Sequence, residues 1–159
     1  MKKLMIKVNV FADNKNRKHK IKNPSLYIKK KVQRLKKYYF FKNKNIEFSI
    51  LLTGNEVIKK LNKRFRNKNK ITDVLSFPFF EQNTLKKMIR ARNNIYLGDV
   101  VINLNKINSS PTNDILLEFN KIWIHGMLHL FGYKHNTNID FKKMNNLEKR
   151  IINYLENEF

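Results

Sequence analysis

The chain has 159 residues, of which 42% are hydrophobic, so it can bury one sizeable core and is not globally disordered. Its lack of Cys and its four Gly and three Pro exclude disulfides, thiolate metal sites and collagen-like or linker sequences. The formal net charge of +22 favours a polyanionic partner, most often nucleic acid. We expect a single domain over residues 1–159.

The basic residues concentrate in the first part of the chain. Residues 1–50 carry a net charge of +14, whereas residues 101–159 carry +1. Because 27 of the 34 basic residues are Lys, drift of an AT-rich coding sequence is an alternative source of the excess charge. The composition leaves both explanations open.

No segment has the features of a targeting signal or a membrane anchor. At the start of the chain, Lys7 and Asn9 interrupt the unbroken apolar stretch that a signal peptide needs. No stretch approaches the roughly 18 apolar residues that span a bilayer. We expect a cytoplasmic protein without a membrane partner.

Apolar periodicity predicts alternating strands and helices in the first half of the chain. Apolar and polar residues alternate in Met5–Phe11, which is typical of a half-buried strand. Asn23 followed by Pro24 predicts a helix start, and Ile46–Leu52 predicts a second strand. The capping box Thr53–Glu56 indicates a second helix. The residues expected on the inner sides of these two helices are Leu26, Ile28, Val32, Leu35, Tyr39, Val57, Ile58, Leu61 and Phe65.

Two more strands and two more helices are predicted in the second half. Asp73–Phe79 is β-prone, and its Pro78 indicates a strand end or a sheet edge. Glu81–Asn94 is polar without a clear period and is expected to form a loop. The remaining predicted elements are a buried strand Tyr96–Leu104, a helix from Pro111 to Leu130 or Phe131 that Gly132 ends, and an amphipathic helix Ile139–Leu155 whose apolar side includes Phe141. The order β-α-β-α-β-β-α-α predicts an α/β (α+β) fold with a single mixed four-stranded sheet packed with helices.

Three of the four histidines lie within eleven residues. His125 and His129 are four residues apart in a predicted helix, which places both rings on one face. Gly132 can reverse the chain, so that His135 swings back toward the same point. Three imidazoles with an open fourth position are typical of a catalytic Zn²⁺ site, so we expect one zinc, or another divalent transition metal, per chain. The alternative is three unrelated histidines, some of them buried in the core.

The spacing H-x3-H-x2-G-x2-H is that of the metzincin zinc proteases. Those enzymes have a Glu directly after the first His as the general base, and here that position is Gly126. The predicted ligands are therefore present and the peptidase base is absent.

The segment HGMLHLFGYKH closely resembles the HGxLHLxGYDH motif of the YbeY family, the metal-dependent endoribonucleases of rRNA maturation. The segments LNKRFRNKNKITDVLSFPF, LGDVVI and MNNLEKRII also resemble that family, so that the similarity covers roughly residues 46–155. The resemblance implies that His125, His129 and His135 bind the metal. It also implies that Arg66 is catalytic or binds phosphate, although Arg66 on its own would be read as part of a solvated basic surface.

The chain departs from the family pattern at three positions. Lys134 replaces an Asp before the third His, so any part that this Asp plays in orienting a ligand is lost or moved. Asn67 replaces the Gly after the Arg, and Ile71 replaces the Pro before Thr-Asp. The last two changes affect the stiffness of a loop more than its chemistry.

The leading hypothesis is a metal-dependent, single-strand-selective endoribonuclease that acts on ribosomal RNA, with the ribosome as partner. The basic residues expected to track the RNA backbone are Lys29, Lys30, Lys36, Arg64, Lys68 and Lys70. One alternative is a zinc metallopeptidase. Another is a non-catalytic RNA-binding factor of ribosome assembly with a structural metal.

Overall fold

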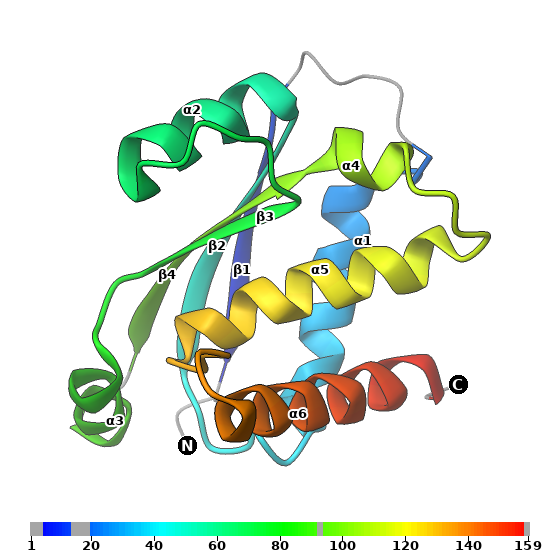
Figure 1. Cartoon of the computed structure of the whole chain (residues 1–159). Helices are drawn as coiled ribbons and strands as arrows, with labels where there is room; N and C mark the ends of the chain where they lie inside the picture. The colour runs from blue at the N-terminus through cyan, green and yellow to red at the C-terminus, as the bar shows by residue number, and fades with distance from the viewer. Residues whose placement is uncertain (1–4, 14–19, 92–93, 158–159) are drawn as a thin grey trace.

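A mixed four-stranded sheet runs through the middle of the molecule (Figure 1). The computed structural model describes residues 5–13, 20–91 and 94–157. The strands are β1 (Ile6–Ala12), β2 (Ile46–Thr53), β3 (Val74–Pro78) and β4 (Ile95–Asn103), in the order β1-β2-β4-β3. The first three strands in this order are parallel, and β3 pairs antiparallel with β4 at the edge, where its proline disturbs no inner ladder. The predicted fold class is confirmed.

Helices cover both faces of the sheet. The larger layer contains α1 (Pro24–Arg34), the short 3₁₀ helix η1 (Leu35–Lys37), α5 (Ile115–Leu130) and α6 (Asn138–Asn157). The opposite face carries α2 (Asn55–Arg66). Successive side chains of β4 point to opposite faces of the sheet. Val100 packs in the main core, whereas Val101 packs on the other face with Ile58 of α2 and Leu75.

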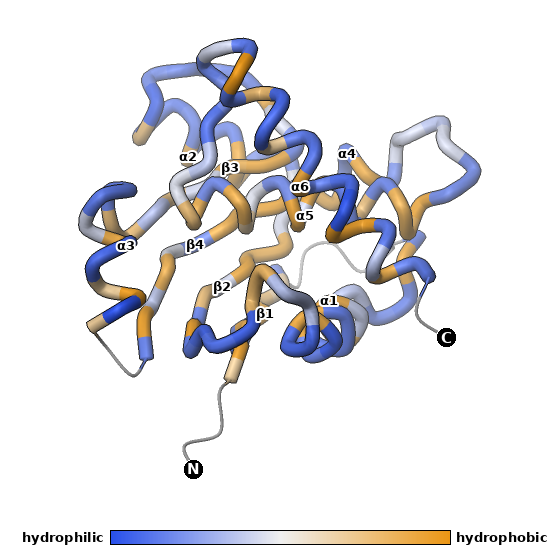
Figure 2. The backbone as a smooth tube through the Cα atoms, turned by 90° about the horizontal axis from the view of Figure 1, so that it is seen from below, coloured by the Kyte–Doolittle hydropathy of each residue, from blue (hydrophilic) through white to orange (hydrophobic). Residues whose placement is uncertain are grey.

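Apolar segments concentrate where the strands and α5 meet, and hydrophilic segments lie outside them (Figure 2). Helix α5 is the most apolar, and its Trp123 is fully buried. The indole Nε1 of Trp123 donates to Asn120 Oδ1 at 2.9 Å. Phe131, just after α5, is also buried. Among the described residues, no helix combines the length and the apolarity that crossing a bilayer requires.

Two short helices were not predicted from the sequence. The expected loop Glu81–Asn94 contains α3 (Gln82–Ala91), whose inner side consists of buried Leu85 and half-buried Met88 and Ile89. Three inward apolar residues in a ten-residue, otherwise mostly polar segment give too weak a periodicity to recognise. Helix α4 (Leu104–Asn108) follows β4 directly, because the Asn103 side chain caps it by accepting from Asn105 N.

Some predicted helix starts and inner positions are wrong. The long helix starts at Ile115 rather than at Pro111, because Asp114 is the N-cap and accepts from Leu117 N at 2.9 Å. Thr53 is no cap: it ends β2, and its hydroxyl donates to Asp13. The predicted inner residues that the structure leaves exposed are Leu26, Tyr39, Phe65 and Phe141.

Candidate metal centre and adjoining cleft

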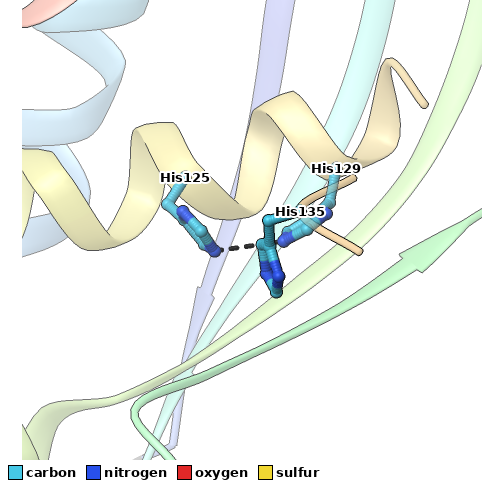
Figure 3. Close-up of side chains that lie close together, drawn as sticks. All are labelled: His125, His129 and His135. Atoms are coloured by element: carbon cyan, nitrogen blue, oxygen red, sulfur yellow. Dashed lines mark hydrogen bonds between the residues drawn. The ribbon is translucent and has the colours of Figure 1, made fainter. Parts of the chain in front are cut away.

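Three histidine side chains converge at the C-terminal end of α5 (Figure 3). His125 and His129 lie on successive turns of that helix. Gly132 then takes a φ of +88°, which ends the helix and turns the chain so that His135 returns to the other two. One nitrogen from each ring lies within 4.8 Å of the others, so the three predicted ligands form one cluster that could hold a metal ion.

The hydrogen bonds of His125 and His129 indicate which nitrogen of these two rings faces the centre of the cluster. His129 Nδ1 lies 2.8 Å from the Tyr133 carbonyl oxygen, which can only accept, so Nδ1 carries the proton. His125 Nδ1 lies 3.3 Å from Glu148 Oε2. The two Nε2 atoms face one another at 3.0 Å. Two ring nitrogens that point their lone pairs at one place suit a shared cation, so the donor set fits a zinc-type metal.

The electrostatics of the cluster favour neutral imidazole at His129. Its pKa is lowered to about 4, first by burial and then by the neighbouring His125, whereas the bond to Tyr133 opposes the shift. The positive charge of Arg66 acts in the same direction as burial. Because a ring must be neutral to coordinate, this environment prepares His129 as a ligand.

Gly126 lies where α5 presses closely on the sheet. A Cβ at this position would lie 2.6 Å from Val100 Cγ1 and 3.1 Å from Val74 Cγ2. The Ser76 hydroxyl also donates to the Gly126 carbonyl at 2.9 Å and ties β3 to the helix. Position 126 therefore faces the sheet, and a glutamate there would clash with the sheet. This is a physical reason, independent of the family, against a metzincin-type peptidase.

A cleft of about 660 Å³ adjoins the histidines. Its lining residues are Arg66, Ser76, Pro78, Phe79, Phe80, Glu81, Gln82, Asn83, His129, Gly132, Tyr133 and Lys134. Arg66, the last residue of α2, and His129, from α5, thus share one cavity although they come from helices on opposite faces of the sheet. The cleft joins the candidate metal centre to the predicted phosphate-binding arginine.

The loop that follows Arg66 is held by asparagines. Asn67 ends α2 with a left-handed φ of 54°, a conformation that Asn tolerates and Gly prefers, which accounts for this departure from the family pattern. Asn62 is buried, and its Nδ2 donates to the Lys70 carbonyl at 2.9 Å. Asn103 donates in the same way to the Thr72 carbonyl at 3.0 Å. The sequence signal for Asn62 was available, because it lies four residues after buried Ile58 on the inner side of α2.

The six other predicted RNA-contacting residues are exposed, and the structure brings none of them into the lining of the cleft. Three lie on α1 and η1: Lys29, Lys30 and Lys36. The other three lie at the end of α2 or in the loop after it: Arg64, Lys68 and Lys70. The lining instead includes Lys134 and the exposed ring of Phe79, which the sequence did not single out for RNA binding.

Fold and site together define a class of protein: an α+β protein with a mixed sheet, a cluster of three histidines at a helix end and an arginine across a cleft. The family model described as Endoribonuclease YbeY matches residues 11–156. The chain belongs to the YbeY family. The match extends further toward the N-terminus than the motifs, which begin near residue 46.

Individual relatives agree with this assignment. The chain is 42% identical over 156 residues to an Endoribonuclease YbeY of Pelagibacter ubique, covering 96% of this chain and 97% of the relative. It is 32% identical over 160 residues to one of Thermodesulfovibrio yellowstonii, covering 89% and 94%. A solution structure from Thermotoga maritima superposes with a TM-score of 0.57 at 23% identity, covering 95% of this chain and 89% of that one, and supports the fold.

Proposed function

We propose that this chain is a zinc-dependent endoribonuclease that cleaves single-stranded ribosomal RNA during ribosome maturation. The observation that carries the proposal is the pairing of the histidine cluster with Arg66 across one cleft. The names of the relatives supply the reaction class, cleavage within an RNA chain. A ribosomal RNA substrate implies work in the cytoplasm.

His125, His129 and His135 would hold the zinc ion, one per chain. When bound, the ion supplies a positive charge that polarises a phosphoryl oxygen and makes water or a 2′-hydroxyl more acidic. Three neutral ligands leave that charge undiminished. The contact between Nδ1 and the Tyr133 carbonyl oxygen leaves Nε2 of His129 directed at the centre.

Arg66 would bind the scissile phosphate from the other side of the cleft. Its planar guanidinium can donate to two phosphate oxygens at once. Negative charge on the phosphoryl oxygens grows in the transition state, so a fixed cation stabilises that state more than the bound substrate. The asparagine contacts after α2 hold the loop next to this side chain.

Features of the cleft favour single-stranded RNA. Phe79 lines it with a ring that is 67% exposed, held edge-on against Phe80 and Tyr96. Unpaired bases stack on exposed aromatic rings, and base pairing in a duplex hides the faces of the bases. Lys134 also lines the cleft and adds a positive charge that can bind the phosphate backbone of the RNA.

The test combines metal analysis of the purified protein with cleavage of matched single-stranded and duplex ribosomal RNA fragments. We expect about one zinc per chain and cleavage of the single strand only. A chelator should remove the activity, and added zinc should restore it. Cleavage that survives complete metal removal would contradict the proposed role of the metal. RNA binding without any cleavage by the zinc-loaded protein would favour an assembly factor instead.

A further inference from the structure

Glu148 lies on α6 at a position that belongs to the apolar side of the helix. It follows buried Met144 by four residues and precedes buried Ile151 by three, so it shares the stripe that packs on the core. Its side chain is only 17% exposed. A carboxylate in this position destabilises the fold unless a hydrogen-bonding or charged group compensates it. The Glu148 carboxylate is therefore expected to have a hydrogen-bonding or charged partner.

That partner is His125. Glu148 Oε2 lies 3.3 Å from His125 Nδ1, across the contact between α6 and α5. The His129 ring is held in the same manner, with its Nδ1 2.8 Å from the Tyr133 carbonyl oxygen. In both rings an acceptor occupies Nδ1 and leaves Nε2 for the centre of the cluster. Helix α5 supplies both histidines, and their Nδ1 atoms contact a carboxylate of α6 and a carbonyl oxygen just after α5.

Glu148 has no contact with the substrate cleft. It lines a separate hollow of about 230 Å³ that shares no lining residue with that cleft. The residues around this hollow are Asp73, Val74, Glu118, Lys121, Ile122, His125 and Glu148. A contribution of Glu148 to the reaction would therefore pass through His125.

We propose that Glu148 is a positioning residue of the metal centre, which accepts a hydrogen bond from Nδ1–H of His125 and thereby directs Nε2 at the ion and strengthens the ligand. The proposal rests on metal binding by the three histidines. Carboxylates in this place fix the tautomer and orientation of a ligand ring and raise its basicity. Position 134, next to His135, is a lysine and offers no carboxylate, so Glu148 is the acid that contacts a histidine of the cluster in the described part of the chain.

The test measures zinc affinity of the full chain by competition with a chromogenic chelator, for wild type and three variants. Glu148→Ala removes the contact and should weaken zinc binding about 10- to 100-fold. Glu148→Gln keeps the size of the side chain and an oxygen that accepts from Nδ1–H, so we expect a clearly smaller loss. Glu118→Ala removes a carboxylate from the same hollow and should leave the affinity unchanged.

A second readout follows the Nδ1 proton of His125 by NMR in the zinc-loaded protein. It should be protected from exchange in wild type and in Glu148→Gln, and lost to exchange in a zinc-saturated Glu148→Ala sample. The proposal would be overturned if Glu148→Gln bound zinc as tightly as wild type and the His125 Nδ1 proton of the wild type were not protected from exchange. So would equal losses in Glu148→Ala and Glu118→Ala, since charge in the hollow and not the contact would then matter. A wild type that binds no zinc would instead refute the metal site itself.

Discussion

The two sides of the cleft are built in different ways. On one side, the cleft is lined by His129, which lies on α5 one turn after His125 and is followed six residues later by His135 through a glycine turn. On the other side, Arg66 is exposed at the end of α2, and the loop after it is held by Asn62 of the same helix and by Asn103, which is distant in the sequence. The metal side depends on local chain geometry, and the arginine side depends on tertiary contacts.

Because the two sides are built differently, we expect the loss of a histidine and the loss of Arg66 to have different consequences. Each histidine offers one of three candidate ligand atoms within 4.8 Å of one another, so the loss of any one of them should remove the metal-binding capacity that we propose for the cluster. Arg66 lines the cleft as a single charge and belongs to no cluster, so under the proposed function its loss should weaken the reaction and leave the histidine cluster intact. Variants of the two sides should therefore fail in distinguishable ways.

The largest effect is expected on the metal side. His129→Ala removes one of only three protein ligands and should abolish stoichiometric zinc binding and RNA cleavage together. Metal content by elemental analysis and cleavage of a single-stranded RNA check both results. His19→Ala, which changes the fourth histidine and falls outside the described residues, is the control and should retain both. One zinc per chain in a variant that lacks all three clustered histidines would refute the assignment.

The next effect is expected on the arginine side. Arg66→Ala should lower the rate of RNA cleavage by roughly 10²–10³, the typical loss when one transition-state donor is removed. Zinc content and the melting temperature should not change, because Arg66 is exposed and contributes no ligand. Arg66→Lys should restore little, because an ammonium group keeps the charge and loses the two-pronged geometry.

Arg64 provides the matched control for charge. It lies two residues before Arg66 on the same helix, is exposed, and does not line the cleft. Arg64→Ala should lower RNA affinity slightly and leave turnover nearly intact. If the two alanine variants lost equal activity, Arg66 would be part of the basic surface only, and its catalytic role would be wrong.

The same difference explains what the sequence could predict. The histidine cluster followed from a spacing of four residues on a helix and a glycine turn, which are local properties, and the structure confirms the convergence. The predicted sheet and the edge position of the strand with Pro78 also followed from periodicity and residue type. Family membership is likewise confirmed.

Features that depend on contacts between distant segments were not predictable. No local sequence pattern predicted that Arg66 and His129 line one cleft. Without the family resemblance, Arg66 is interpreted as part of a solvated basic surface. Glu148 interrupts an apolar stripe, a signal that becomes meaningful only when α6 is known to face His125. Helix α3 has only a small apolar side, and its packing depends on the burial of Leu85 in the core.

A smaller effect should come from the contacts that hold the loop after Arg66. Asn62→Ala removes the partly buried hydrogen bond to the Lys70 carbonyl and should destabilise the fold by about 1 kcal/mol, measured by urea unfolding. We also expect slower RNA cleavage than in wild type, but faster than in Arg66→Ala, with full zinc content. Asn67→Gly is the control, since Gly accepts the left-handed conformation at this position without strain. Unchanged cleavage in Asn62→Ala would mean that the loop does not position Arg66.

The smallest and most diffuse effect is expected from the exposed basic residues away from the cleft lining. Two triple variants to Glu compare them: one on α1 and η1, at Lys29, Lys30 and Lys36, and one near the cleft, at Arg64, Lys68 and Lys70. If a set neutralises three phosphates of single-stranded RNA, its loss should reduce the salt dependence of log affinity by about 2 units of slope, because fewer counterions are released. The loss should be alike for all RNA sequences, and zinc content should stay at the wild-type value. We expect both sets of residues to contribute to RNA affinity, with the larger loss for the variant at Arg64, Lys68 and Lys70. An affinity of wild type that does not vary between low and physiological salt would show that the charge of +22 reflects composition and not RNA binding.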